Sequence, residues 1–368
     1  MPWELNEAAF RAPAQAAALV RAIRAHTDPA RPLRLMEICG THTMAIAKAG
    51  LRGLLAPGVQ LLSGPGCPVC VTPTGAIDAA LQLSERPGVT IASYGDLLRV
   101  PGSCKGDTLL RRRALGAQVL TVYSAMEAVE AAAANPQQHI VFLGVGFETT
   151  APGTAACIRE AAERGLPNFS VLSLLKRTEP ALRALIAAPD FAVDGFLCPG
   201  HVAAVTGAAA FGFLPEEYRL PAVVCGFEAG DILYAVWRLV RMREQGCPAL
   251  ENEYTRLVTD TGNPAARAAI EAVFEPVESD WRGLGRIPAS GYALRPAYAV
   301  WDAAIKFGVV PGRAAETPGC RCGDVLRGAC APADCPLFGK ACTPAEPVGP
   351  CMVSGEGACA AAWKYQNL

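Results

Sequence analysis

Short apolar runs recur along the chain, and most of them end in a loop rich in Gly, Pro, Thr or Cys before a helix-forming segment. The pattern is clearest at residues 139–145, which are followed by the loop GFETT and a predicted helix over 152–164. Regular alternation of strand and helix predicts a parallel sheet with crossover helices, which is an α/β fold. Ligands of such sheets bind beyond the carboxyl ends of the strands, so these loops are the candidate sites.

The loops also point to an internal duplication. Eight runs are predicted to be strands: 33–38, 59–62, 89–93, 119–123, 139–145, 169–175, 193–197 and 222–225. The loop CGTHT (39–43) corresponds to GFETT (146–150), and GPGC (64–67) corresponds to CPGH (198–201). We interpret this as two similar Rossmann-like parallel-sheet domains of roughly four strands each. The alternative is chance similarity, because Gly and Pro populate all such loops.

The predicted boundaries follow from this duplication. A chain of 368 residues has room for two or three domains. We place the first α/β domain at 32–135, the second at 136–228, and a third in 1–31 together with 229–368. Within the third domain, 276–289 is predicted to be an irregular connection and 294–307 a helix. No chemically specific motif occurs in 248–319.

The charge balance excludes some partners. The chain has 33 basic and 34 acidic residues, so neither a nucleic acid nor an anionic membrane surface is expected to bind it. It contains no run of 18 apolar residues, which predicts no membrane-spanning helix. The first residues lack the features of a signal peptide, so we expect a soluble cytoplasmic protein.

Cys67 and Cys70 form a pair at the end of one predicted strand, in a tight Gly- and Pro-rich loop. In a reducing compartment, such a pair is more typical of redox chemistry or metal binding than of a structural disulfide. The alternative is two incidental loop cysteines.

Cys39 is placed between the strand 33–38 and a predicted helix at 44–51. Backbone N–H groups and the helix dipole at this position favour an anion, which predicts a lowered pKa for the thiol. His42 follows within one helical turn, with a simple helix-capping role as its alternative. Two facing sheets would bring six side chains toward one cleft, which we state as a hypothesis: Cys39, His42, Cys67, Cys70, Glu148 and His201.

The C-terminal region is dense in cysteine, with seven of the 15 cysteines between Cys320 and Cys359. A segment with few aromatic residues and no clear periodicity is expected to fold around metal. The wide spacings suit a cubane iron–sulfur cluster held by four thiolates. The expected ligands are Cys322, Cys335, Cys342 and Cys359, with Cys320 as the substitute for Cys322. A zinc site is the alternative.

Five separated motifs resemble those of the HypD family of nickel–iron hydrogenase maturation factors. They are CGTH (39–42), GPGCPVC (64–70), GFETT (146–150), PGHV (199–202) and CPLFGKACTP (335–344) followed by CMVSGEGAC (351–359). The resemblance spans nearly the whole chain. One departure is Gly355, where serine is expected.

The resemblance implies a function. HypD proteins assemble the iron centre that carries two cyanides and one carbon monoxide, in complex with the chaperone HypC and with cyanide supplied by HypE. It implies two α/β domains, a third domain with a [4Fe-4S] cluster, and a redox-active dithiol. Its essential thiols correspond to Cys39, Cys67 and Cys70, and a functional histidine and glutamate to His42 and Glu356.

The roles of these residues remain open in part. Cys39 is the first candidate ligand for the cargo iron, while Cys67 and Cys70 are either an electron-transfer pair or iron ligands themselves. Two other functional classes remain as alternatives. One is an iron–sulfur disulfide reductase without iron cargo, and the other is a zinc-stabilised interaction protein.

Overall fold

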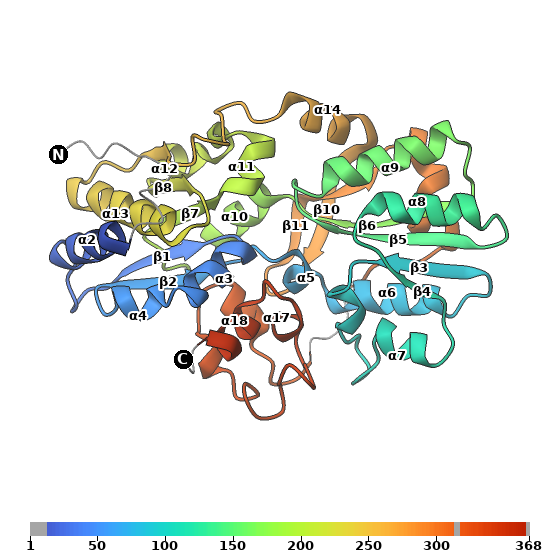
Figure 1. Ribbon diagram of the computed structural model, residues 1–368, viewed down its shortest axis with the longest axis horizontal. Coiled ribbons are helices and arrows are strands. Elements are labelled where there is room, and N and C mark those ends of the chain that lie inside the picture. The colour runs from blue at the N-terminus through green and yellow to red at the C-terminus, as the bar shows by residue number, and fades with distance from the viewer. Residues whose placement is uncertain (1–12, 313–316, 366–368) are drawn as a thin grey trace.

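The computed structural model describes residues 13–312 and 317–365 (Figure 1). Residues 1–12, which belong to the predicted third domain, lie outside this range, as do 313–316 and 366–368. The prediction of an α/β fold with two parallel sheets is confirmed. No helix in the described part of the chain combines the length and apolar character needed to cross a bilayer.

Sheet A has five parallel strands in the order β2-β1-β7-β8-β9. The strands are β1 (Leu33–Glu37), β2 (Val59–Ser63), β7 (Gly195–Pro199), β8 (Ala222–Cys225) and β9 (Leu250–Asn252). In the centre, Leu35 pairs with Leu61 on one side and with Gly195 on the other.

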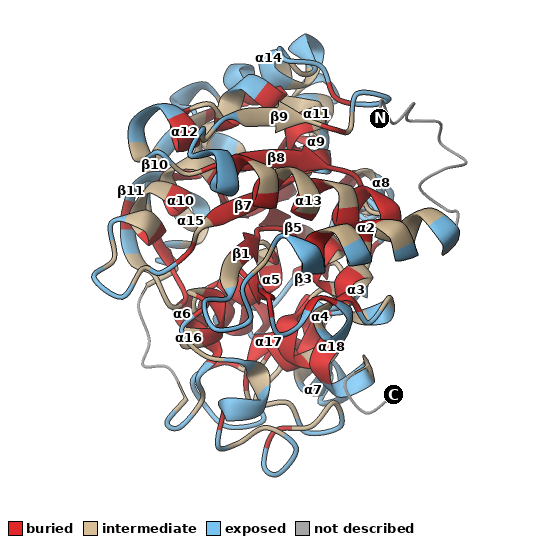
Figure 2. Ribbon diagram, turned by 90° about the vertical axis from the view of Figure 1, so that its left-hand side faces the viewer, coloured by how far each residue is buried: buried red, intermediate tan, exposed pale blue. Residues whose placement is uncertain are grey.

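Helices cover both faces of sheet A. One face packs under α2 (Pro13–Ala25), α3 (Gly40–Lys48), α4 (Leu51–Leu55) and α13 (Ala229–Gln245). The other packs under α10 (Thr178–Ile186), α11 (Gly200–Thr206), the 3-10 turn η2 (Ala208–Phe211) and α12 (Phe213–Tyr218). Figure 2 shows β7 and β8 buried between helices whose outer faces are exposed. Burial on both faces explains why the strands read as continuous apolar runs rather than alternating ones.

Sheet B has four parallel strands in the order β4-β3-β5-β6. They are β3 (Val89–Ser93), β4 (Val119–Thr121), β5 (His139–Gly146) and β6 (Phe169–Leu175). One face packs against α6 (Thr74–Ser84), η1 (Leu97–Arg99) and α7 (Leu109–Ala114). The other packs against α8 (Ala125–Ala134), α9 (Ala151–Glu163) and α14 (Pro264–Val273).

The sheets do not follow the predicted boundary between 135 and 136. Strands β1 and β2 belong to sheet A, whereas β3 and β4 of the same segment belong to sheet B, where β3 pairs with β5. The expectation of one sheet for each half is therefore wrong, because similar loops do not determine which strands hydrogen-bond. The chain crosses between the sheets through α5 (Pro68–Val71) and α6, and returns through α10. Helix α5 consequently lies between the two sheets (Figure 1).

Residues 274–294 form an antiparallel hairpin of β10 (Phe274–Trp281) and β11 (Gly285–Leu294). The prediction of an irregular connection here is wrong. The helix expected at 294–307 is instead η3 (Pro296–Trp301) followed by α15 (Ala303–Phe307). Pro276 and a register shift between Val277 and Ser279 obscure the strand pattern, since proline is rare within strands.

The cysteine-rich segment folds into four short helices: α16 (Cys322–Leu326), η4 (Pro332–Asp334), α17 (Pro350–Val353) and α18 (Ala358–Tyr365). Helix α18 contacts α3 of sheet A, and α17 contacts α5. Figure 1 shows this segment below the region where the sheets meet. The segment is thus packed against the strand-end loops that carry the candidate site.

Candidate thiol and metal site

Cys39 caps the N-terminus of α3, directly after β1, and its side chain is only 9% exposed. Its N–H donates to Glu37 Oε2 over 3.0 Å. Burial raises the pKa of the thiol to about 12, and the carboxylates of Glu37 and Glu356 add to the rise. The predicted lowering is wrong, because the backbone N–H groups of one helix end do not offset removal from water. Cys39 therefore stays a thiol until a cation displaces its proton.

The predicted dithiol is a disulfide between Cys67 and Cys70. Cys67 caps α5, and its sulfur accepts the Cys70 N–H over 3.1 Å. The loop before it lies against the Cys39 loop, since Gly40 N–H donates to Gly66 O over 3.1 Å. A Cβ atom at Gly66 would collide with the backbone of Cys39, so only glycine permits this approach. The structure thus brings Cys39 and the dithiol loop together, as predicted.

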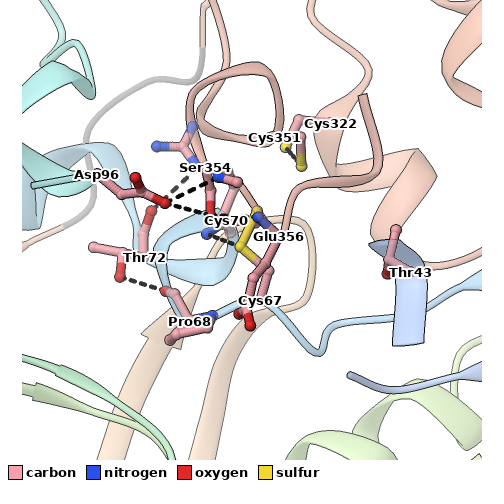
Figure 3. The surroundings of a disulfide bond; sticks show 12 residues. Thr43, Cys67, Pro68, Cys70, Thr72, Asp96, Cys322, Cys351, Ser354 and Glu356 are labelled. Atoms are coloured by element: carbon pink, nitrogen blue, oxygen red, sulfur yellow. Dashed lines mark hydrogen bonds between the residues drawn. A yellow bond between two sulfur atoms is a disulfide. The ribbon is translucent and has the colours of Figure 1, made fainter. Parts of the chain in front are cut away.

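Glu356 reaches the same place from the C-terminal region. Thr41 Oγ1 donates to Glu356 Oε1 over 2.9 Å, which joins the tail to the loop after β1. Burial raises the pKa of the Glu356 carboxyl. Figure 3 shows Glu356 close to the Cys67–Cys70 disulfide. A site glutamate contributed by the tail is therefore placed beside the sheet A loops.

The tail is also tied to sheet B, through Asp96 in the loop after β3. Asp96 Oδ2 accepts from Ser354 Oγ over 3.2 Å and from Gly355 N–H over 2.9 Å (Figure 3). A Cβ at Gly355 would meet only that carboxylate, at 3.8 Å, so the serine expected there would fit. Residues 354–356 therefore clip the carboxyl ends of the two sheets together. We call them the tail clip.

His42 is fully buried on the first turn of α3, and its ring reaches the loop after β8. Its Nε2 donates to Gly226 O over 2.8 Å and lies 3.6 Å from Cys225 Sγ. Nδ1 has no hydrogen-bond partner in the described chain. Burial lowers the pKa of His42 to about 4, so the ring is neutral near pH 7. The capping alternative is wrong, because the N-cap is Cys39.

His201 lies in the first turn of α11, after β7, and shares an aromatic stack with His42. The ring of Phe227 is stacked against both imidazoles, with centroids 4.6 Å from His42 and 4.0 Å from His201. Glu148 lies elsewhere: its carboxylate accepts from Thr178 N–H and from Thr178 Oγ1, each over 2.7 Å. Glu148 is thus a buried cap of α10 at sheet B, while His42 and His201 meet at sheet A.

Two charged groups near the site were missed in the sequence. Glu37 is completely buried in β1, and its Oε1 accepts from Thr43 Oγ1 over 2.5 Å. The sequence feature that could have revealed Glu37 is a charged residue within the apolar run 33–38. Glu253 accepts the Gly226 N–H over 3.3 Å, and burial raises the pKa of its carboxyl to about 8. It lies in the segment judged to contain no specific motif.

A small, partly open pocket in the C-terminal segment is lined mainly by sulfur and apolar side chains. Its cysteines are Cys320, Cys322, Cys335, Cys342, Cys351 and Cys359, beside Leu337, Phe338 and Met352. We call it the cysteine pocket. It includes the four predicted cluster ligands and their substitute. Cys351 was not predicted, yet its Sγ lies 2.7 Å from that of Cys322. Cys330 lines a different cavity, along β2.

The donor set of the cysteine pocket fits a polynuclear cluster by its chemistry. Burial raises the pKa of Cys320 to about 12, so metal would have to displace the proton. Within 13–312 and 317–365, no group of three or more His, Cys, Asp or Glu side chains is arranged to hold a metal ion. Soft thiolates in apolar surroundings suit an iron–sulfur group.

The fold and site define a parallel two-sheet α/β protein whose strand-end loops gather buried thiols beside a cysteine pocket. A family model described as "HypD: Hydrogenase formation hypA family" matches residues 14–366. The chain belongs to the HypD family, as its motifs suggested.

Named relatives agree with this assignment over nearly the full length. The chain is 47% identical over 354 residues to hydrogenase maturation factor HypD of Rhizobium leguminosarum bv. viciae, covering 94% of this chain and 92% of that one. It is 46% identical over 362 residues to the HypD of Azotobacter vinelandii, with 97% and 95% covered. It is 44% identical over 364 residues to the HypD of Escherichia coli K12, with 97% of each covered. These relatives support a role in hydrogenase maturation.

Proposed function

We propose that this protein is the cytoplasmic scaffold on which the Fe(CN)2CO group of nickel–iron hydrogenases is assembled. It would act in complex with a HypC-type chaperone and receive cyanide from a HypE-type donor. The observation that carries the proposal is the packing of the Cys39 loop against the Cys67–Cys70 loop, with Glu356 held beside them. Three motifs distant in sequence contribute to one buried site.

Cys39 is the proposed iron ligand, together with a cysteine of the chaperone. Soft thiolate is a suitable ligand for iron that carries cyanide and carbon monoxide. The Cys39 proton has to leave when the sulfur binds the cargo. Glu37 is proposed to accept it, since burial raises the pKa of this neighbouring carboxyl to about 7. A group with that pKa can both take up and release a proton near neutral pH.

Cys67 and Cys70 are proposed to be a redox pair rather than iron ligands. Their disulfide supports this role, because bonded sulfurs lack the thiolate that a metal requires. Reduction of the disulfide takes up two electrons and two protons and leaves two thiols. Both cysteines belong to the same packed core as Cys322 and Cys351 of the cysteine pocket. That packing supports electron exchange between the two places.

The cysteine pocket is proposed to hold a [4Fe-4S] cluster through Cys322, Cys335, Cys342 and Cys359. Cys320 and Cys351 line the same pocket and are the alternative ligands. The bound group would supply electrons one at a time. Cys342→Ala should remove its visible absorbance and lower stability, whereas Cys330→Ala, outside the pocket, should change neither. An unchanged spectrum in Cys342→Ala would refute the ligand set.

Infrared spectroscopy tests the scaffold role directly. The protein is co-produced anaerobically with a chaperone and a cyanide donor, and the purified complex is examined for bands of metal-bound cyanide and carbon monoxide. We expect both kinds of band. Absence of the cyanide and carbon monoxide bands from a fully assembled complex would refute the proposal.

A second function is favoured by the Cys67–Cys70 disulfide itself. A disulfide reductase would use a cluster beside the dithiol and carry no iron cargo. A complex without infrared bands, but with a dithiol that titrates reversibly, would select this function. Metal analysis that finds zinc and no iron would select a zinc-stabilised interaction protein instead.

A further inference from the structure

We propose that Glu253, Asp231 and Arg256 are positioning residues that hold His42 in a single tautomer. In that tautomer Nε2 carries the hydrogen and Nδ1 accepts a hydrogen bond from a protic ligand. His42 then does not donate to the nitrogen of a bound cyanide. The identity of the ligand rests on the proposed function, whereas the tautomer does not.

The first step is the position of Gly226 between Glu253 and His42. The Gly226 N–H donates to Glu253 Oε1 over 3.3 Å, and its carbonyl oxygen accepts from His42 Nε2 over 2.8 Å. A carbonyl oxygen can only accept, so Nε2 must carry the hydrogen. A neutral imidazole has one N–H, which leaves a lone pair on Nδ1. Glu253 therefore acts on His42 through one glycine.

The second step is the ion pair between Arg256 and Asp231, which lies next to Gly226. Arg256 Nη2 lies 2.5 Å from Asp231 Oδ2, and the Asp231 side chain is completely buried. A Cβ at Gly226 would collide with the Asp231 carboxylate and approach Arg256 Nη2 to 2.7 Å. The same carboxylate oxygen accepts the Glu228 N–H over 3.2 Å. Residues 226–228 are thus held in place by charged groups from α13 and from the loop after β9.

The third step is the stack that fixes the imidazole plane. Phe227 follows Gly226, and its ring is stacked on His42. The edge contact of Phe227 with Tyr254 has a centroid distance of 5.9 Å, and the guanidinium of Arg256 lies 4.3 Å from the Tyr254 centroid. Stacking fixes the plane of the His42 ring, and the Gly226 carbonyl fixes its rotation. Both constraints depend on residues 253–256.

The last step is the unpartnered Nδ1 atom of His42. The His42 side chain has no exposed surface, and Nδ1 has no partner among the described residues. Buried acceptors are normally satisfied, so this atom is the place for a ligand's hydrogen. A lone pair repels the nitrogen of metal-bound cyanide, which is itself an acceptor. The geometry therefore favours a thiol S–H or another protic group as the ligand.

Nitrogen-15 NMR of labelled histidines tests the tautomer in the full chain without cargo. The chain has four histidines, so the His42 signals can be assigned from their loss in His42→Gln. We expect His42 in the Nε2–H form in the unsubstituted protein. In Glu253→Ala, loss of the bond to Gly226 should lower the tautomer ratio about fivefold, which moves the two nitrogen shifts toward each other.

Matched variants separate positioning from folding. Glu253→Gln retains a carbonyl acceptor and should keep the Nε2–H form. Glu251→Ala is the control, because this carboxylate on β9 pairs with Arg238 at 2.6 Å. If Glu253→Ala fails to fold, Arg256→Ala should produce a shift in the same direction. An Nδ1–H tautomer in the unsubstituted protein, or an unchanged ratio in folded Glu253→Ala and Arg256→Ala, would overturn the inference. Missing infrared bands would overturn only the scaffold.

Discussion

Charged side chains are buried at the carboxyl ends of both sheets, but their hydrogen bonding differs between the two ends. At sheet B, Glu148 accepts two hydrogen bonds from Thr178, and Lys176 Nζ donates to Ser279 Oγ and to Asp280 O. At sheet A, several buried polar atoms have no partner. Of the four such atoms of the described chain, three follow the carboxyl ends of sheet A strands: His42 Nδ1 in α3, Asp231 Oδ1 in α13 and Glu253 Oε2 just after β9. The fourth, Arg34 Nε, lies at the amino end of β1.

The difference assigns separate roles to the two ends. A buried polar atom without a partner is costly, so a cluster of them marks a place where a ligand completes the hydrogen bonding. Satisfied charges, by contrast, stabilise the fold. We therefore interpret the sheet A end as the chemical site and the sheet B end as its support. Asp96 is the point where sheet B holds the tail clip.

The largest expected effect compares one buried thiol from each region. Cys39→Ala should abolish the infrared bands of the loaded complex, because the proposed iron ligand is lost. The visible absorbance of the cluster proposed for the cysteine pocket should remain. Cys157→Ala, in α9 against sheet B, is the matched control and should load normally. Bands that survive in Cys39→Ala would remove the distinction between the two ends.

Glu148→Ala should mainly affect stability. The change leaves the N–H and hydroxyl of Thr178 buried without their acceptor, which we expect to cost about 2–3 kcal/mol of unfolding free energy. Urea denaturation measures the loss, with the half-exposed Glu160→Ala on α9 as control. The folded fraction should still load iron. Normal stability combined with lost loading would show that sheet B also carries chemistry.

Asp96→Ala should loosen the tail clip. Ser354 and Gly355 lose their shared acceptor, and the local opening free energy should fall by about 1 kcal/mol. Amide hydrogen exchange at 354–357 should then speed up, while exchange in α9 stays unchanged. Unaltered exchange in the clip would mean that Asp96 is not its anchor.

The smallest effect concerns pH. Burial lowers the pKa of His139, on β5, to about 4, with a contribution from Lys306. The unfolded residue has a pKa of ~6.5, so between these two pKa values the unfolded state binds more protons than the folded state. Stability should therefore fall as the pH drops from about 6.5 toward 4. His139→Gln should flatten this part of the profile. A slope equal to that of the unsubstituted protein would contradict the prediction.

Local patterns predicted most of the strands and the meeting of the two thiol loops. Each βα loop follows its own strand, so the position of Cys39 depends on nearby residues. The exchange of strands between sheets could not be predicted, because Leu35 pairs with Gly195 across a long stretch of chain. The role of Glu253 was missed for the same reason. It acts through Gly226, and neither residue has a motif that links it to His42.

The tail clip also determines when during synthesis the site can form. Glu356 of the clip and its partner Thr41 are 315 positions apart. At ~5–20 residues per second, a ribosome needs roughly 15–60 s between them. During that interval the Cys39 loop has been made, but the carboxylate that covers it has not. The surroundings of Cys39, the proposed iron ligand, are therefore completed only after Glu356 has been synthesised, so a nascent chain does not present all of these groups at once.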